Sequence, residues 1–596
     1  MPAPAPSLRR KLLFSAIVTS FVLLLFVGSL ELILRVLSYG HSPHFARGTS
    51  LPSGETFWRE NRWCTAPYFS PQLVRRPTPF RLSAKKAPNT YRIFVLGSSA
   101  AMGDPEPSFS LARMLDAMLH AAYPELHFEV VNAAITAINS HVVRGIAADC
   151  AQLEPDLFLV YEGHNEVIGP FGPAGVFTPF LRSPASIRLA AALKTSRTGQ
   201  LATSLHRRLS TGKDAVEWGG MQMFLDHQIA FDDPRLDAVR ENFRANLVDI
   251  ADRAASAGAR TLLCTVVTNQ RDFAPFLSLH RADLSSDARL RWQQQLDAAL
   301  AAERADNFPA AEIAYRAALA IDDHHAELHF RLGRLFLRLD RNAEAGTHLQ
   351  RALDLDALRF RTDSALNQII RDVAAAHHSA AGLVDLAASL ARRSEAGIPG
   401  DDFLYEHVHL TFRGTYEIAR DLFTHVSHDL ARRRFITAHA PEPFSYDEAR
   451  IRLAYTTHEQ AMIALELLNR FRSPPFTGQI DHAYRLQTWQ RRADAARTLL
   501  DRAEALPALR ELYQRALATA PDDWILARNA GSMFATRQAP AEALPLLERA
   551  TTWIDDDPDT LLALAWTYHA LQDKSRAAEL FNRVRTLEPH YPGLPE

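Results

Sequence analysis

The sequence predicts an α/β protein with a parallel five-stranded sheet, joined to helical repeats and to one apolar N-terminal helix. Three observations predict this. Short apolar runs alternate with amphipathic helical patterns from residue 90 onward, helical segments recur with a 34-residue period in two places, and residues 12–30 carry no charge. The chain has 596 residues, too many for one hydrophobic core, so we expect several domains.

The N-terminal 40 residues are predicted to be a short tip and a transmembrane anchor. Arg9, Arg10 and Lys11 precede the uncharged run "LLFSAIVTSFVLLLFVGSL" at 12–30. A helix of that length spans about 28 Å, close to the ~30 Å hydrocarbon core of a bilayer. The run continues into "ELILRVLSYG" without a clear small-residue cleavage site, although a cleaved signal peptide is the alternative. The basic cluster predicts that the N-terminus stays in the cytoplasm and that the rest of the chain lies outside it.

The sheet is predicted from five apolar runs, "YRIFVLG" (91–97), "HFEVVNAAI" (127–135), "DLFLVYEG" (156–163), "RTLLCTVV" (260–267) and "AGLVDLAA" (381–388). Continuous apolar strands between amphipathic helices indicate a parallel sheet covered on both faces, hence a three-layer α/β/α domain. We expect it over residues 88–284 and 363–435, after a connector of mixed composition at 41–87. Ligands in such sheets bind at the carboxyl ends of the strands.

The repeats are predicted from a constant spacing. Ala318 and Ala352 are 34 residues apart, and so are Ala516, Ala550 and Val584. A 34-residue helix–turn–helix period with small residues at fixed positions is typical of tetratricopeptide repeats. We expect an inserted pair at 285–362, which splits the sheet domain, and a C-terminal array at 445–596. Such arrays present concave surfaces, so a protein partner is expected.

Composition excludes several classes of function. The net charge is −2, without the basic excess of a nucleic-acid-binding protein. Cys64, Cys150 and Cys264 are scattered and form no metal-ligand spacing, so we expect no zinc site.

The stretch "RIFVLGSSAAMGDP" (92–105) places two serines on a tight turn after a buried strand. A serine hydroxyl becomes a nucleophile when a base lies within hydrogen-bond reach and a third group orients that base. His409 is the candidate base, because it precedes an amphipathic helix and follows Glu406 by three residues. His407 is the competing histidine, and Asp402 is an alternative orienting carboxylate.

Four short blocks at strand ends resemble the SGNH, or GDSL-like, hydrolase family. They read Gly97-Ser98-Ser99 with Gly103, Asn132 to Ala137, Gly163-His164-Asn165-Glu166, and Glu406-His407-Val408-His409. Three positions depart from the family pattern: Ser98 and Glu406 stand where the family has Asp, and Ala137 stands where it has Gly. Further segments resemble a membrane-anchored subgroup of that family with tetratricopeptide repeats.

The resemblance implies catalytic roles for these residues. Ser99 would be the nucleophile, His409 the base and Glu406 its orienting group. The backbone N–H groups of Ser99 and Ala137 and the side chain of Asn165 would form the oxyanion hole, with Gly97, Gly163 and His164 in support.

The resemblance therefore implies an exported serine esterase without a cofactor, held in the inner membrane with its catalytic domain in the periplasm. It suggests acyl esters on carbohydrate or cell-envelope material as substrates. Two alternatives stay open. An O-acyltransferase would use the same acyl-enzyme, and a catalytically inactive scaffold would act only through its repeats. The substitutions at Ala137 and Glu406 favour the scaffold, whereas Ser99, Asn165 and His409 argue against it.

Overall fold

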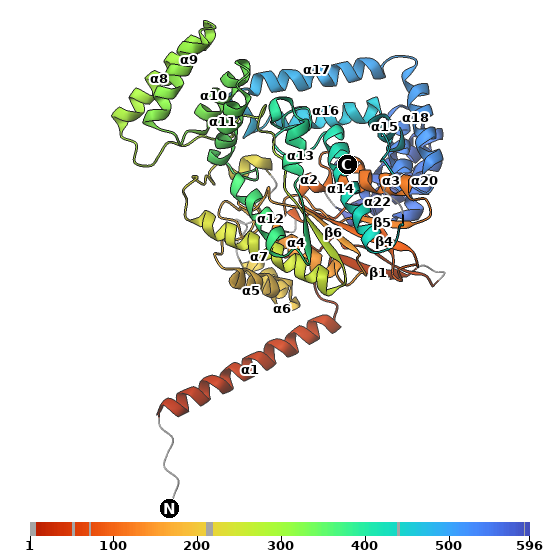
Figure 1. The fold of residues 1–596 in the computed structure, drawn as a ribbon. Helices are drawn as coiled ribbons and strands as arrows, with labels where there is room; N and C mark the ends of the chain where they lie inside the picture. The colour runs from red at the N-terminus through yellow and green to blue at the C-terminus, as the bar shows by residue number, and fades with distance from the viewer. Residues whose placement is uncertain are drawn as a thin grey trace, which may run out of the picture.

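The computed structural model describes residues 8–50, 54–70, 73–209, 219–437, 441–588 and 591–595 (Figure 1). Its centre is a sheet of five parallel strands: β4 (Thr90–Gly97), β5 (His127–Asn132), β6 (Leu157–Tyr161), β7 (Arg260–Cys264) and β8 (Ala381–Val384). Their spatial order is β5-β4-β6-β7-β8. This confirms the parallel five-stranded sheet. Every residue of β4 and β6 is buried, which explains why β6 is apolar throughout and β4 is apolar from Ile93 onward.

Helices cover the sheet in two groups, with the strands between them (Figure 1). One group contains α4 (Ser140–Cys150), α7 (Arg235–Ser256) and α12 (Ser364–Ala376), and the other contains α3 (Leu111–Ala122), α13 (Leu386–Arg393) and α14 (Phe412–Arg432). The chain moves from β4 outward to β5 and then back across β4 to β6. Right-handed crossovers in opposite directions place their helices on opposite faces, so the strand order alone accounts for the two layers.

The connector contains a small antiparallel sheet that the sequence analysis did not anticipate. β1 (Ala46–Ser50), β2 (Thr56–Glu60) and β3 (Arg81–Ser83) pair in that order. Their apolar positions are too few for a period-2 pattern to stand out, because polar residues such as Arg59 and Glu60 are buried here. Arg59 forms ion pairs with Asp555 and Asp556, which joins the connector to the C-terminal helices.

Between β7 and β8 the chain forms two helical hairpins. α8 (Ser286–Arg304) packs on α9 (Phe308–Ile321), and α10 (Ala326–Arg338) packs on α11 (Asn342–Leu355). These helices have a hydrophobic core separate from that of the sheet. The insertion therefore projects from the sheet domain as its own unit (Figure 1).

The C-terminal part is helical and divides into two sections. The first comprises α15 (Tyr446–Arg452), α16 (Thr457–Phe471), the 3-10 turn η5 (Phe476–Gly478) and α17 (His482–Leu500). Apolar side chains of α16, η5 and α17 belong to the core of the sheet domain. The second comprises α18 (Ala505–Thr519), α19 (Trp524–Thr536), α20 (Pro540–Trp553), α21 (Pro558–Ala570) and α22 (Lys574–Leu587), and it has a core of its own.

Three longer helices and several single turns complete the described elements. α1 (Leu8–Val36) is long and apolar enough to cross a membrane, with a mean hydropathy of 2.4 over its apolar part. α5 (Pro184–Thr195) and α6 (Arg197–Leu209) form a hairpin near its C-terminal end (Figure 1). Three further 3-10 turns are η2 (Pro107–Phe109), η3 (Gly220–Phe224) and η4 (Glu395–Gly397), and α2 (Ser99–Met102) is a single helical turn.

Candidate active site

The candidate site lies at the carboxyl end of β4, where the strand order reverses direction. β4 ends at Gly97, and Ser99 begins α2 two residues later. A Cβ on Gly97 would lie 2.2 Å from the carbonyl oxygen of Tyr161 on β6, so only glycine fits between the two strand ends. The close approach brings the segment after β6, which carries Gly163 and Asn165, next to the serine turn. Crevices at such reversal points are the usual ligand sites of parallel sheets.

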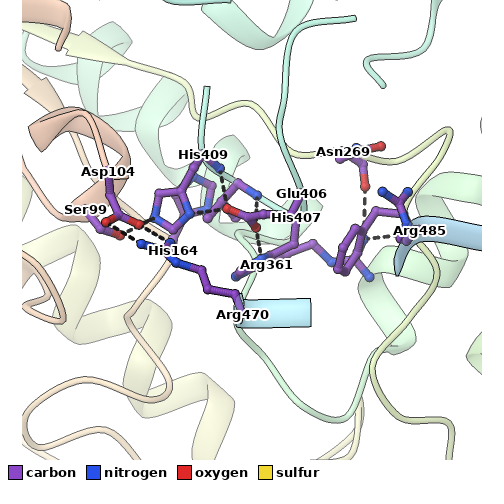
Figure 2. Close-up of polar contacts among 12 residues, drawn as sticks. Ser99, Asp104, His164, Asn269, Arg361, Glu406, His407, His409, Arg470 and Arg485 are labelled. Atoms are coloured by element: carbon purple, nitrogen blue, oxygen red, sulfur yellow. Dashed lines mark hydrogen bonds and ion pairs between the residues drawn. The ribbon is translucent and has the colours of Figure 1, made fainter. Parts of the chain in front are cut away.

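Ser99, His409 and Glu406 form one continuous chain of contacts (Figure 2). The hydroxyl of Ser99 lies 2.8 Å from Nε2 of His409. Nδ1 of His409 donates a hydrogen bond to Oε1 of Glu406. A carboxylate at Nδ1 fixes the ring with its lone pair at Nε2, and this tautomer accepts the proton of a serine hydroxyl.

The turn from 404 to 410 fixes Glu406. Leu404 and Leu410 form a β-bridge, and the N–H of Tyr405 donates to the carbonyl of His409 at 2.8 Å. The Glu406 carboxylate also accepts backbone N–H groups from Val408 and His409, each at 3.3 Å. The additional methylene of Glu relative to Asp is thus accommodated within a compact turn.

The second oxygen of Glu406 contacts the ring of His407, so one carboxylate holds both histidines. His407 faces the aromatic side chains of Phe273, Phe276 and Phe476 instead of Ser99. Between the two histidines, the structure therefore places His409 at the serine. Burial alone would raise the pKa of Glu406, but the two imidazoles hold it well below its ordinary value. The alternative carboxylate, Asp402, pairs with Arg271 at 3.2 Å.

A second carboxylate, which the sequence analysis missed, lies on the other side of His409. Oδ2 of Asp104 is 3.2 Å from Nε2, the same nitrogen that faces Ser99. Burial opposes the charged imidazole, but Glu406 and Asp104 together outweigh it and raise the pKa of His409. Two flanking carboxylates stabilise the imidazolium that forms when the ring takes up a proton.

Asp104 is in turn bound by Arg470, which comes from α16 in the C-terminal part (Figure 2). Nη2 of Arg470 donates to Oδ1 of Asp104 at 2.9 Å. Arg470 also pairs with Glu466 one turn earlier on the same helix, at 2.8 Å. A residue that lies 366 positions after Asp104 in the chain thus contributes to the electrostatics of the serine turn.

The predicted oxyanion donors lie in the two loops beside Ser99. Asn132 ends β5, and its amide donates to the carbonyl of Met102 at 3.0 Å, which ties that loop to the serine turn. Ala137 has a φ of 60°, a left-handed conformation that favours glycine. The amide of Asn165 donates one hydrogen bond to the carbonyl of Ile138 at 2.8 Å, so this contact fixes the amide plane. The oxyanion role of these residues stays a prediction.

His164 is buried next to the histidines, where burial lowers its pKa to about 3 and keeps it neutral. The N–H of Thr362 lies 3.3 Å from its Nδ1, which places the proton on Nε2. Gly163 leaves room for the side chain of Thr362, because a Cβ at position 163 would lie 2.9 Å from Oγ1 of Thr362. These contacts fix the loop after β6 against Thr362, and the supporting role of Gly163 and His164 in catalysis stays a prediction.

Residues of the C-terminal part pack against the segments that surround the candidate site. Phe476 packs against Phe273 and Phe276, Gln479 donates to the carbonyl of Ala274 at 2.7 Å, and Arg485 pairs with Asp401 at 3.3 Å.

A cavity of about 710 Å³ lies beside Arg470 and Met102, between the connector, the 105–107 loop and the C-terminal helices. Within the ranges that the structure describes, no group of three or more His, Cys, Asp or Glu side chains is arranged to hold a metal ion.

Comparison with known proteins identifies the repeats. The family model for tetratricopeptide repeats matches residues 326–357, which are α10 and α11. This confirms a tetratricopeptide repeat in the insertion and supports binding of a protein partner. No curated protein matches the chain.

A solved structure described as YrrB, "a TPR protein with an unusual peptide-binding site", aligns with 52% of this chain and 95% of its own, at 13% identity and a TM-score of 0.13. A similarity of that size does not define a fold. Neither of these matches is to a hydrolase.

Proposed function

We propose that the chain is a membrane-anchored serine esterase whose helical repeats bind a protein partner. The observation that supports the enzymatic half is the contact chain from the partly buried Ser99 through His409 to the buried Glu406. A serine on a turn is common, but a serine whose hydroxyl meets a histidine held by a carboxylate is the arrangement that nucleophilic catalysis requires.

In the proposed reaction, Oγ of Ser99 attacks the carbonyl carbon of an ester while its proton passes to Nε2 of His409. Glu406 and Asp104 stabilise the imidazolium formed in this step. The imidazolium then protonates the departing alcohol oxygen as the C–O bond breaks, which leaves an acyl-serine. In the second half, His409 takes a proton from water while the water oxygen attacks the acyl carbon. The imidazolium then returns this proton to Oγ of Ser99 as the acyl–serine C–O bond breaks, which releases the acid.

The oxyanion of each tetrahedral intermediate needs donors that already point at it. The backbone N–H groups of Ser99 and Ala137 and the second amide hydrogen of Asn165 are the proposed donors. Loss of one such donor reduces the rate by about 10²–10³-fold in serine hydrolases. The proposed reaction requires neither a metal nor an organic cofactor.

The test is fluorophosphonate labelling of the full chain in detergent, with the adduct located by mass spectrometry. We expect an adduct on Ser99, none in Ser99→Ala, and strongly reduced labelling in His409→Gln. Ser98→Ala is the matched control, because it removes the neighbouring hydroxyl and should leave the Ser99 adduct intact. Absence of an adduct on the folded, monodisperse wild-type chain would overturn the esterase proposal.

The same adduct would form in an O-acyltransferase, which passes the acyl group to a sugar hydroxyl instead of water. The two reactions differ in their products. Incubation with an acyl donor and a sugar acceptor should release free acid from an esterase and acylated sugar from a transferase.

A second function, protein binding without catalysis, is favoured by the tetratricopeptide match at 326–357. Helical repeats present extended surfaces to peptides and proteins, and this role needs nothing from Ser99. A chain that fails to label at Ser99 but still crosslinks to a partner through α8–α11 would establish the scaffold as the function.

A further inference from the structure

The hairpin of α5 and α6 exposes an apolar face. On α5 the exposed residues Ala185, Leu189, Ala192 and Leu193 recur at helical spacing along one side. On α6 the exposed apolar residues are Ala202, Leu205 and Leu209. Leu189 and Leu193 are 62% and 59% exposed, and Leu209 is 81% exposed. A stripe of this period normally faces a core, and here it faces outward.

The hairpin is fixed to the C-terminal end of α1. The carboxylate of Glu31 accepts the backbone N–H groups of Arg197 and Thr198, at 3.1 and 2.8 Å, at the start of α6. Gln200 then bonds both backbone groups of His41, as acceptor at 2.8 Å and as donor at 3.0 Å. These contacts hold the first turn of α6 beside the point where the chain leaves α1 (Figure 1).

The position of Glu31 determines where the α5–α6 hairpin lies relative to the membrane surface. If residues 12–30 fill the hydrocarbon core, Glu31 is the first residue beyond its outer boundary. The start of α6 then lies at the level of the lipid headgroups. On α6 the exposed Arg208 stands next to Leu209. The basic residues of α5 face the protein, since Arg188 pairs with Asp249 at 2.7 Å and Lys194 lies over the ring of Phe171. Helices with an apolar face and a basic flank lie in the plane of a membrane surface.

We propose that the α5–α6 hairpin lies in the outer surface of the bilayer that α1 spans, with Leu189, Leu193, Leu205 and Leu209 among the upper acyl chains. The inference rests on the proposed membrane anchor and adds a second attachment to it. The occupant of the apolar face is lipid, because α6 packs against α1 and is bonded to Glu31 at the end of its apolar run. With two attachments, the sheet domain and Ser99 keep a fixed height and orientation above the membrane.

The experiment is depth-dependent fluorescence quenching of the full chain in nanodiscs. Cys64, Cys150 and Cys264 are all buried, so a bimane label reacts selectively with an introduced exposed cysteine. Leu193→Cys and Leu205→Cys report on the hairpin. Leu23→Cys in α1 is the positive control, and Ile313→Cys, an exposed apolar position on α9, is the matched negative control. Each variant is compared in discs with and without doxyl-labelled phosphatidylcholine.

We expect doxyl lipid to remove most of the fluorescence at positions 23, 193 and 205 and to leave position 313 unchanged. Quenching at 23 together with none at 193 and 205 would overturn the hairpin inference while the anchor stands. An unquenched label at 23 would overturn the anchor itself, and the inference with it. Labels at 193 and 205 that are shielded from both doxyl lipid and aqueous iodide would show that a second protein copy covers the face, which also overturns the inference.

Discussion

At the scale of single residues, the charge around His409 is the feature with the clearest chemical consequence. Glu406 lies at Nδ1 and Asp104 at Nε2, and together they raise the pKa of the ring. The neutral ring is the form that accepts the serine proton, so labelling of Ser99 should become faster as the pH rises through the pKa of His409.

Asp104→Asn keeps the shape of the side chain and removes one of the two charges. The pKa of His409 should therefore fall, and the acidic limb of the rate–pH profile for fluorophosphonate labelling should move to lower pH. Glu466→Gln is the matched control, because Glu466 is the other carboxylate partner of Arg470 and has no contact with His409. A profile for Asp104→Asn that coincides with the wild-type profile would show that this carboxylate has no influence on the base.

The sequence allowed part of the candidate site to be predicted and left another part hidden. Ser99, Ala137 and Asn165 follow strands whose apolar runs are easy to recognise, so their meeting at one sheet edge follows from the topology. Asp104 stands next to a recognised block but has no distinctive spacing. Arg470 belongs to an ordinary amphipathic helix, and only the docking of α16 brings it to Asp104.

At the scale of elements, the helical hairpins depend on close contacts between a small residue and a leucine. A Cβ on Gly531 in α19 would lie 2.6 Å from Cγ of Leu547 in α20. The same contact joins Gly333 in α10 to Leu349 in α11, at 2.7 Å. The two regions thus share one packing rule, as their common 34-residue period predicts.

Gly531→Ala should lower the local stability of the α19–α20 hairpin by about 1–3 kcal/mol, because the new methyl group overpacks against Leu547. Gly145→Ala in α4 is the matched control, since its nearest neighbour is the Tyr68 hydroxyl at 3.8 Å. There the gain in helix propensity should raise local stability by about 0.5–1 kcal/mol. Hydrogen exchange of the two helices measures both effects, and equal changes in both variants would contradict the packing argument.

The elements that the sequence analysis missed are those with mixed polarity. β1–β3 bury charged residues such as Arg59 against partners in the loop between α20 and α21, so an alternation of apolar and polar residues never develops. The five strands of the large sheet were predictable because both of their faces are covered by helices.

At the scale of the whole molecule, α16 belongs to the core of the sheet domain, whereas α18 begins the separate C-terminal core. Glu459 on α16 accepts hydrogen bonds from Tyr513 on α18 and from Thr456. Burial raises its pKa to about 7. A carboxyl group whose pKa is raised on folding stabilises the folded state fully below its unfolded pKa of 4.5, and this contribution is lost as the pH rises through 7.

The junction between the two cores should therefore weaken between pH 5 and pH 8, by about 2–3 kcal/mol for this one group. Hydrogen exchange of α18, corrected for intrinsic rates, measures the change. Glu459→Gln replaces the titrating group by a neutral one of the same shape and should remove most of the pH dependence. A variant as pH-sensitive as the wild-type chain would assign the effect to other groups, such as the buried Glu166.

The interrupted sheet described above has a consequence for the order of folding. β7 and β8 are neighbours, yet the four inserted helices separate them in the chain, and Ser99 is 310 residues from His409. Contacts this distant in sequence form late, because the entropy cost of closing a long loop comes before the contact contributes any stabilising free energy. A chain that emerges from a ribosome or a translocation channel N-terminus first presents Ser99 long before its base. In the proposed mechanism, Ser99 therefore acquires its base only after both the insertion and β8 have followed, so no acyl transfer through Ser99 is expected before the whole domain is assembled.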